Sequence, residues 1–178
     1  MSTTIFQGKH VLVVDRDGWE YVERIRGKEA AVIVAETDDG RVLFVEQFRP
    51  PVNMRVIDFP AGLIGDESPD ENPADTARRE LEQETGFICA RIELLASSPS
   101  SPGITSEIIR LYRATGLTRQ GSGGGVEGEN ITVHLIPRDD VEAWLEQQQT
   151  AGVLVDLKVW AGLYFVLHAD LCAQSGDL

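Results

Sequence analysis

Cysteine and basic side chains are both scarce in this sequence of 178 residues. The two cysteines, Cys89 and Cys172, have neither the number nor the spacing of a disulfide framework or a structural zinc site. We therefore expect two reduced thiols that pack as small apolar side chains. The fold should then be stabilised by a hydrophobic core.

The shortage of lysine and arginine narrows the class of partners. The chain has 16 basic residues against 29 acidic ones, a formal net charge of −13, and its pI is near 4.6. A protein that binds nucleic acid or an anionic membrane needs a basic face that meets phosphate groups. We therefore expect no nucleic-acid partner and no membrane partner. A small anionic ligand is compatible with this charge if a metal ion bridges it to the protein.

Long apolar runs are absent as well. A helix that spans a membrane needs roughly 20 apolar residues, whereas the longest candidates here are segments such as residues 30–35. The first 14 residues, MSTTIFQGKHVLVV, contain neither the basic region nor the apolar region of a secretory signal, so we expect a cytoplasmic protein. The length, with 42% hydrophobic and 25% charged residues, predicts a single globular domain over residues 1–178.

Extended segments separated by turn residues dominate the first half of the chain. Turn signals lie at residues 15–18 and 38–40, and Pro50-Pro51 interrupts the series. The predicted extended segments are residues 10–15, 19–26, 30–36, 41–48, 56–59, 87–96, 108–114 and 131–136.

Two helices are predicted by local signals. Residues 73–85 should be helical, because Asn72 can cap free N–H groups, Pro73 suits the first helical position and Gly86 suits the end. Residues 155–172 carry apolar side chains every three or four positions, which predicts a helix with a core stripe. The stripe residues are Leu157, Trp160, Tyr164, Leu167 and Leu171.

Acidic residues gather around the first of these helices. Residues 66–84 contain eight acids and two bases, close to half of the net charge. Glu80, Gln83 and Glu84 lie three or four positions apart and share one helical face. Carboxylates one turn apart beside the core suit a hard cation such as Mg²⁺, and a solvated acidic helix is the alternative. The adjoining apolar stripe consists of Ala74, Ala77 and Leu81.

A longer spacing favours the metal site over the solvated helix. Gly65 is followed after five residues by Glu71, and seven residues later by RELEQETGF at residues 79–87. This spacing over residues 65–87 resembles the Nudix box, G-x5-E-x7-R-E-U-x-E-E-x-G-U, where U is apolar. The one departure is Gln83, which stands where the family has the first glutamate of its Glu-Glu pair. By this motif the chain is identified as a member of the Nudix hydrolase family.

The resemblance implies a fold and a metal site. The Nudix fold is an α/β/α sandwich around a mixed β-sheet, and the box is a loop, helix and loop that holds divalent metal at a diphosphate. The expected ion is Mg²⁺, with Mn²⁺ as the alternative, and Glu71 and Arg79 match a structural pair that orients the helix. The implied metal ligands are Glu80, Glu84 and the carbonyl of Ala61, with Gln83 as a neutral contributor that supplies no charge.

The segments around the box resemble one branch of the family. VEQFRPP at residues 45–51 and DFPAG at residues 58–62 are similar to elements of the ADP-ribose pyrophosphatases, and Pro102 matches their marker proline. Asp58 replaces the usual glutamate. The resemblance implies hydrolysis of ADP-ribose to AMP and ribose 5-phosphate. Two alternatives remain: a broader nucleoside diphosphate sugar hydrolase acting on ADP-glucose or GDP-mannose, and a non-catalytic sensor of ADP-ribose, which only Gln83 supports.

The resemblance also implies a homodimer. In this branch the N-terminal strands, here about residues 1–48, commonly exchange between protomers in an antiparallel β-sheet region, and the nucleobase stacks on aromatics there. Trp19 and His10 match those positions, with a packing role as the alternative for Trp19 and a surface role for His10. The histidine departs from the usual tryptophan, which weakens the expected preference for adenine. The other implied substrate-binding residues are Arg24, Gln47, Arg49, Pro102 and Gly103.

The catalytic acid should follow the one low-complexity stretch, QGSGGG at residues 120–125. We interpret this stretch either as a flexible surface loop or as a mobile loop that closes over the substrate. By the resemblance, Glu127 and Glu129 match the catalytic position, and Glu84 completes the catalytic group. We favour Glu127 as the base or water-orienting group and Glu129 as a metal-site or supporting residue, and the reverse assignment stays open.

Overall fold

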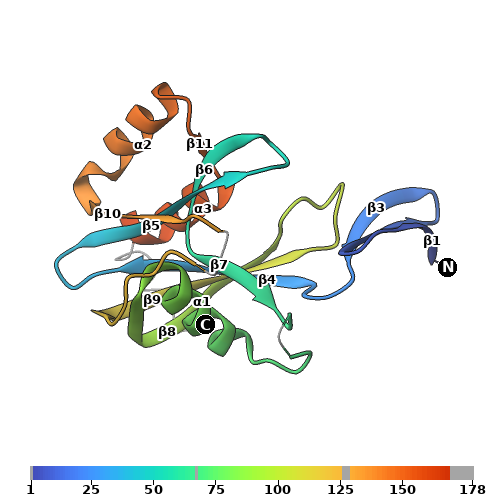
Figure 1. Ribbon diagram of the computed structural model, residues 1–178, viewed down its shortest axis with the longest axis horizontal. Helices are drawn as coiled ribbons and strands as arrows, with labels where there is room; N and C mark the ends of the chain where they lie inside the picture. The colour runs from blue at the N-terminus through green and yellow to red at the C-terminus, as the bar shows by residue number, and fades with distance from the viewer. Residues whose placement is uncertain (1, 67, 126–128, 169–178) are drawn as a thin grey trace.

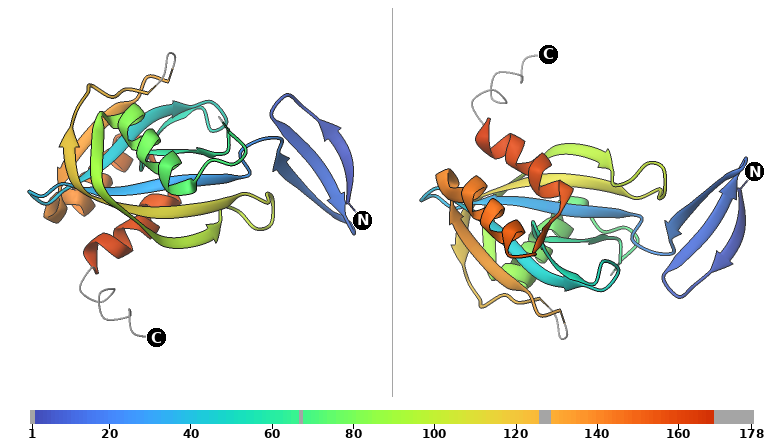
Figure 2. Two further views of the ribbon diagram at one scale, coloured as in Figure 1. Left: turned by 90° about the horizontal axis from the view of Figure 1, so that it is seen from below. Right: turned by 90° about the horizontal axis from the view of Figure 1, so that it is seen from above.

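Three antiparallel strands at the N-terminus form a separate small sheet, which projects from the rest of the computed structural model (Figure 1, Figure 2). The structure describes residues 2–66, 68–125 and 129–168. The strands are β1 (Ser2–Gln7), β2 (Val11–Arg16) and β3 (Trp19–Arg24). Two backbone hydrogen bonds tie β3 to the body. Val22 N–H donates to the Ile104 carbonyl at 2.8 Å, and Ser106 N–H donates to the Val22 carbonyl at 3.2 Å.

Eight further strands form the main sheet. In chain order they are β4 (Glu29–Glu36), β5 (Arg41–Arg49), β6 (Met54–Asp58), β7 (Ala61–Ile64), β8 (Phe87–Pro99), β9 (Ile108–Arg119), β10 (Thr132–Pro137) and β11 (Leu154–Val155). In space the order is β11-β6-β5-β4-β9-β8, with β10 paired to β5 and β7 paired to β4. β4 is parallel to β9 and β11 is parallel to β6, whereas the other pairs are antiparallel, so the sheet is mixed as predicted.

Helices cover both faces of the main sheet and create three layers (Figure 2). The helices are α1 (Pro73–Thr85) on one face, and α2 (Val141–Thr150) and α3 (Leu157–Leu167) on the other, with the short 3-10 turn η1 (Arg138–Asp140) before α2. Side chains along β4 alternate between two cores, as the pleat of a strand requires. Val32 and Val34 pack toward α2 and α3, whereas Ala31 and Ile33 pack toward α1. The layers confirm the predicted α/β/α sandwich. None of the described helices has the length and apolarity needed to cross a membrane.

Helix α1 begins and ends at the predicted residues. The Asn72 side chain accepts a hydrogen bond from the Ala74 N–H at 2.9 Å, and Pro73 occupies the first helical position. Gly86 ends the helix in the left-handed conformation, with φ of 75°. Leu81 is fully buried, which confirms that the acidic face borders the core. These local signals therefore fix the segment that carries the acidic side chains.

Helix α3 turns the opposite face to the sheet from the one predicted. The stripe of Leu157, Trp160, Tyr164 and Leu167 is exposed, and Leu157 is 81% exposed. The buried side is instead Val159, Gly162, Leu163 and Val166. Because α3 is apolar on nearly every side, both stripes satisfy the helical spacing, and close packing at Gly162 selects the buried one. Leu171 and Cys172 lie outside the described residues.

Candidate functional site

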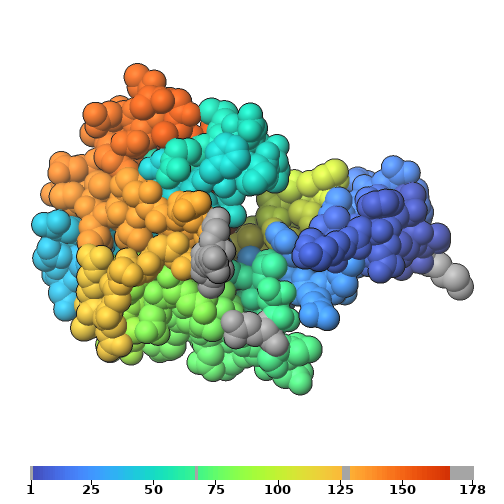
Figure 3. All heavy atoms as spheres, viewed as in Figure 1, coloured from blue at the N-terminus to red at the C-terminus, as the bar shows by residue number. Residues whose placement is uncertain are grey.

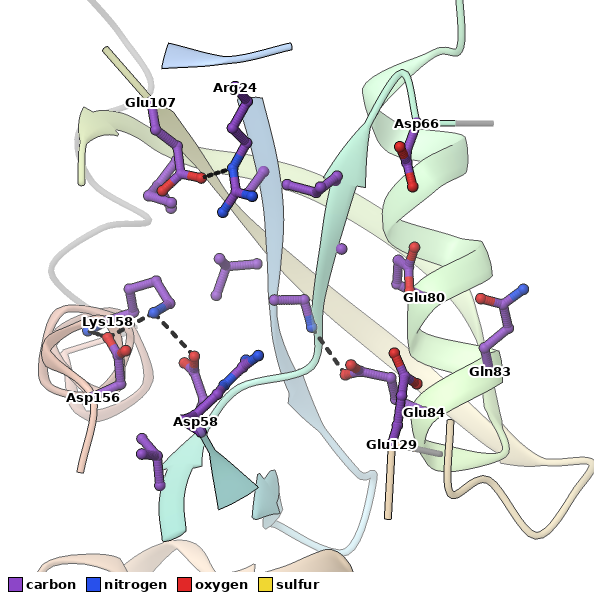
Figure 4. Close-up of a pocket in the computed structure, with 18 of the residues that line it drawn as sticks. Arg24, Asp58, Asp66, Glu80, Gln83, Glu84, Glu107, Glu129, Asp156 and Lys158 are labelled. Atoms are coloured by element: carbon purple, nitrogen blue, oxygen red, sulfur yellow. Dashed lines mark hydrogen bonds and ion pairs between the residues drawn. The ribbon is translucent and has the colours of Figure 1, made fainter. Parts of the chain in front are cut away.

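A cavity of about 740 Å³ opens between β6, β7, α1, β9 and the start of α3, and Figure 3 shows the surface hollowed there. Its lining includes four basic and seven acidic side chains, a formal net charge of −3 if all of them are ionised. Nine of these residues are labelled in Figure 4: Arg24, Asp58, Asp66, Glu80, Glu84, Glu107, Glu129, Asp156 and Lys158. The other two are Arg49 and Arg79. A phosphate-containing ligand would meet an excess of like charge here unless cations accompany it.

Glu84, from the last turn of α1, is a buried acid of this cavity and is only 6% exposed. Its Oε2 accepts a hydrogen bond from the Ala61 N–H at 3.0 Å. Burial raises the pKa of the Glu84 carboxyl to about 8. The negative charges of Glu80 and Glu129 also raise this pKa, whereas Arg49 lowers it. Carboxylates from two distant segments thus meet on one wall of the cavity.

Glycine at position 62 leaves room for Glu80. A Cβ atom at Gly62 would overlap the Glu80 carboxyl group, so a side chain at this position would displace the carboxylate. The glycine of the PAG element therefore has a steric role. It allows β7 to lie directly against the acidic face of α1.

Arg79 forms hydrogen bonds beside the acidic wall, which is the cavity wall that carries Glu80, Glu84 and Glu129. Its Nε donates to Glu71 Oε1 at 3.2 Å, which places the predicted structural pair in contact. Burial raises the pKa of Glu71, but the hydrogen bonds from Arg79, Thr76 and the Gly65 backbone, together with the positive charge of Arg79, outweigh this and hold the pKa below its usual value. Arg79 Nη1 donates to Glu80 Oε1 at 2.8 Å and to Gln83 Oε1 at 3.2 Å. The amide oxygen of Gln83 is therefore engaged by a guanidinium.

The acidic wall fits a hard divalent cation by its chemistry. Glu80, Glu84 and Glu129 offer only oxygen atoms, and a positive charge among them would favour the ionised form of Glu84. Within the described ranges, no three acidic, histidine or cysteine side chains already surround a position for an ion. Water and substrate oxygens would therefore complete the coordination shell of such an ion.

The opposite wall contains a partly buried ion cluster (Figure 4). Lys158 Nζ lies 3.0 Å from Asp58 Oδ2 and 2.7 Å from Asp156 Oδ1. Burial raises the pKa of Asp58 to about 6, although the ammonium of Lys158 opposes this rise. Asp156 also caps α3, because its Oδ1 accepts a hydrogen bond from the Lys158 N–H at 3.0 Å. Sequence reasoning missed Lys158 and Asp156, and the capping position of Asp156 was the available signal.

Two of the predicted substrate-binding arginines also line the cavity. Arg24, the last residue of β3, places its Nε 2.6 Å from Glu107 Oε1. Arg49, at the end of β5, also lines the cavity. Both arginines therefore lie where they can meet an anionic substrate.

Other predicted site residues lie away from this cavity. Trp19 is 69% exposed on the projecting N-terminal sheet, and His10 is exposed in the same region. Gln47 is buried in β5, whereas Pro102 and Gly103 are exposed between β8 and β9. A single chain does not bring these side chains together with the acidic wall. Glu127 lies outside the described residues.

The glycine-rich stretch at residues 120–125 lies against the last turn of α1. Its backbone is hydrogen-bonded to the end of α1: Gly124 N–H donates to the Glu84 carbonyl at 2.7 Å, and Gly125 N–H donates to the Gln83 carbonyl at 3.1 Å. The last carbonyl groups of a helix have no hydrogen-bond donors within the helix, and the N–H groups of this stretch serve as donors to two of them. Glycine composition alone suggested flexibility because it does not reveal these bonds.

Residues 26–157 match the NUDIX domain family, which is more than half of the chain. The chain therefore belongs to the Nudix family and is a Nudix pyrophosphohydrolase. Its motifs and relatives support the ADP-ribose pyrophosphatase branch.

Three relatives illustrate the range of this similarity. The chain is 34% identical over 128 residues to the methanol dehydrogenase activator of Bacillus methanolicus, covering 71% of this chain and 68% of that protein. It is 33% identical over 96 residues to the ADP-ribose pyrophosphatase of Bacillus subtilis (strain 168), covering 54% of this chain and only half, 50%, of that protein. It is 31% identical over 156 residues to the GDP-mannose pyrophosphatase of Enterobacter sp. (strain 638), covering 83% and 78%.

A solved structure supports the fold over the whole chain. The crystal structure of an ADP compounds hydrolase superposes with a TM-score of 0.68 at 20% sequence identity, covering 98% of this chain and 94% of that chain. At this identity the likeness concerns the fold.

Proposed function

We propose that this Nudix enzyme hydrolyses the diphosphate of ADP-ribose in the presence of Mg²⁺, giving AMP and ribose 5-phosphate. The observation that carries the proposal is the wall formed by Glu80, Glu84 and Glu129 in a cavity that also contains Arg24 and Arg49. Such a cavity suits a diphosphate that arrives with divalent cations. The relatives named for ADP-ribose hydrolysis support the choice of substrate.

Each side chain has an assigned part in this proposal. Glu80, Glu84 and the Ala61 carbonyl would hold Mg²⁺, with Glu129 as a supporting acid. When bound, Mg²⁺ supplies charge neutralisation of the diphosphate and lowers the pKa of bound water. Gln83 supplies no charge, because its amide oxygen accepts from Arg79.

The chemical step needs an acceptor for one proton. A water oxygen forms a bond to one phosphorus, the bond between that phosphorus and the bridging oxygen breaks, and the water proton passes to a carboxylate. We assign that carboxylate to Glu127. Arg24 and Arg49 bind the anionic substrate and orient it for the attack.

We also propose a homodimer in which the N-terminal sheet of one protomer reaches the cavity of the other. Neither Trp19 nor His10 lines the cavity of its own chain, which supports contact with a nucleobase bound by another molecule. The exposed apolar side chains of β1, Ile5 and Phe6, support such an interface. In this arrangement Trp19 stacks on the base and His10 lies beside it.

A broader nucleoside diphosphate sugar hydrolase is the second candidate. The similarity to GDP-mannose pyrophosphatases covers more of the chain than the similarity to the ADP-ribose pyrophosphatases does. His10, in place of an aromatic partner for adenine, favours the same interpretation. Values of kcat/KM for ADP-ribose, ADP-glucose and GDP-mannose separate the candidates, because the preferred substrate is the one with the highest value.

The direct test is incubation of the full chain with ADP-ribose and Mg²⁺, followed by chromatographic separation of the nucleotides. We expect equal amounts of AMP and ribose 5-phosphate. A matched reaction with Glu84→Gln controls for a contaminating hydrolase. Binding of ADP-ribose without formation of AMP would reject the proposed hydrolysis of ADP-ribose. If ADP-glucose and GDP-mannose also stayed intact, the result would favour the sensor.

A further inference from the structure

The glycine-rich stretch, residues 120–125, makes four backbone hydrogen bonds to the end of the Nudix helix. Besides the bonds from Gly124 and Gly125, the N–H groups of Gln120 and Gly121 both donate to the Gly86 carbonyl, at 2.8 Å and 3.1 Å. The last turn of α1 has no basic side chain that could serve these carbonyls. The stretch therefore acts as the cap of the helix that carries Glu80 and Glu84.

Gly123 allows the two backbones to approach this closely. A Cβ atom at Gly123 would overlap the backbone of Thr85 and lie 2.7 Å from the Glu84 carbonyl oxygen. These are main-chain atoms within a helix, so they cannot rotate away as the end of a side chain can. Any larger residue at position 123 must lift the stretch from α1.

Gly125 makes room for a carboxylate. A Cβ atom there would overlap Glu129 Oε2 and lie 2.9 Å from Ile131 Cδ1. The space that glycine leaves open is therefore the space in which the Glu129 carboxylate lies. This carboxylate is close enough to Glu84 for its charge to act on that group.

We propose that Gly123 and Gly125 are positioning residues for the acidic wall. Gly123 seats the stretch on the last turn of α1, and Gly125 lets Glu129 occupy the space beside Glu84. When Glu84 is ionised, its charge repels that of Glu129, so the two carboxylates stay together only if the backbone holds them there. This inference rests on the proposed function for the meaning of the wall as a Mg²⁺ site.

The test compares alanine variants that differ in what the added methyl group meets. Gly123→Ala meets the α1 backbone, and Gly125→Ala meets the Glu129 carboxylate. Gly40→Ala is the matched control, because Gly40 has the same φ as Gly125, 76°, and a Cβ there has no atom within 4 Å. All three variants carry the backbone strain of alanine at positive φ, but only the first two disturb the wall.

Calorimetric titration of each full-length variant with Mg²⁺ alone measures the effect without substrate. We expect Gly123→Ala and Gly125→Ala to lose about 10- to 100-fold in Mg²⁺ affinity, the range for groups that orient ligands. Gly40→Ala should keep the wild-type affinity. At saturating Mg²⁺, kcat for ADP-ribose should fall in the two loop variants while KM stays close to wild type.

Two results would overturn the inference. The first is Mg²⁺ affinity in Gly125→Ala equal to that in Gly40→Ala, and this variant decides the matter if Gly123→Ala does not fold. The second is rapid hydrogen exchange of the Gly124 and Gly125 amides in the wild-type protein, because their bonds to α1 should protect them. If the wild type binds Mg²⁺ but leaves ADP-ribose intact, the proposed function fails, and the binding and exchange data still decide the positioning role.

Discussion

Glu84 is a carboxyl group that the fold keeps away from water and beside two other acids. Burial and the charges of Glu80 and Glu129 raise its pKa to about 8, so at neutral pH the metal-free protein holds a proton there. A group with a raised pKa stabilises the fold fully below its ordinary pKa near 4.5, and this stability is lost as the pH rises through 8. Stability and metal binding therefore make opposite demands on this residue.

Glu84→Gln should separate these demands. The amide oxygen can still accept the Ala61 N–H, and the penalty for a buried negative charge disappears. In metal-free protein at pH 8.5, we expect a rise in Tm of about 2–4 °C for each kcal/mol gained, as measured by scanning calorimetry. Turnover should fall by at least about 100-fold, because a charged group at the reacting centre is lost.

The pH at which the Tm comparison is made provides its control. Below pH 4.5 the wild-type carboxyl is neutral, so the wild type and Glu84→Gln should unfold at the same temperature. A variant that is less stable than wild type at pH 8.5, or that retains turnover, contradicts the assignment of a buried, metal-directed carboxylate.

Binding of Mg²⁺ should release a proton from Glu84. At pH 7 the metal displaces the proton that the buried carboxyl holds, whereas at pH 9.5 the group is already ionised. Calorimetric titrations in buffers of different ionisation enthalpy measure this release directly. We expect a buffer-dependent heat at pH 7 that disappears at pH 9.5, and the same heat in all buffers at pH 7 would rule the proton release out.

Helix α3 shows what decides the orientation of an apolar element. The helix contacts the sheet through its glycine, because a Cβ at Gly162 would overlap the ring of Phe59 and lie 2.8 Å from Val34 Cγ2. The small side chain lets the helix lie close to the sheet, and the bulky Trp160 and Tyr164 are left on the outer face. Close approach therefore outweighs the burial of the largest side chains.

Gly162→Ala tests this packing through two opposing effects. Alanine favours a helix over glycine by about 1 kcal/mol, whereas an overpacked core costs about 1–3 kcal/mol. Because the added methyl group meets a buried ring, we expect a net loss in the free energy of unfolding, measured by urea denaturation. Leu157→Ala on the exposed face should change it by less than about 0.5 kcal/mol. A more stable Gly162→Ala protein would show that α3 does not pack this closely.

A comparison of α1 with α3 shows which elements could be predicted from the sequence. The bounds of α1 follow from Asn72, Pro73 and Gly86, which act on the backbone within a few residues. The face of α3 depends on Phe59, a residue far away in the chain. The predictions also omitted β1, β7, β11 and α2. β1 is exposed throughout, and β7 and β11 are only four and two residues long, so these three strands show little hydrophobic pattern in the sequence.

The same difference between local and distant contacts separates the predicted residues of the candidate site from those that were missed. Glu80 and Glu84 could be predicted because both lie on one helix, where their relative position follows from their spacing in the sequence. The cluster of Lys158, Asp58 and Asp156 could not, since it forms only when α3 packs beside the end of β6. The contact of residues 120–125 with α1 likewise depends on backbone hydrogen bonds, which carry no side-chain signature.

At the scale of the whole molecule, acidic side chains are concentrated around one cavity, where they can bind a cation. Seven acidic side chains line one cavity, with four basic ones in the same walls. The N-terminal sheet projects from the rest of the molecule (Figure 1), and neither Trp19 in β3 nor His10 before β2 is among the residues that line this cavity.

Mixing two defective variants tests the proposed exchange of N-terminal sheets. Trp19→Ala leaves the acidic wall intact, and Glu84→Gln leaves the aromatic residue intact. If the sheet of one protomer serves the cavity of the other, a mixed dimer contains one complete site. We expect Trp19→Ala alone to raise KM, and co-refolding with Glu84→Gln to restore the wild-type KM in part of the enzyme. Unchanged kinetics in a dimer shown to be mixed would assign Trp19 to its own chain.

Arg24 gives the N-terminal sheet a further significance. It is the last residue of β3 and at the same time a wall of the cavity, where it meets Glu107. The sheet and the cavity thus share one side chain, so a tilt of the sheet displaces a guanidinium beside the substrate. By thermodynamic reciprocity, a ligand that holds Arg24 also favours one tilt of the sheet. In the proposed dimer, occupancy of the cavity and association through the sheet would therefore be linked equilibria, so a measurement of one would report on the other.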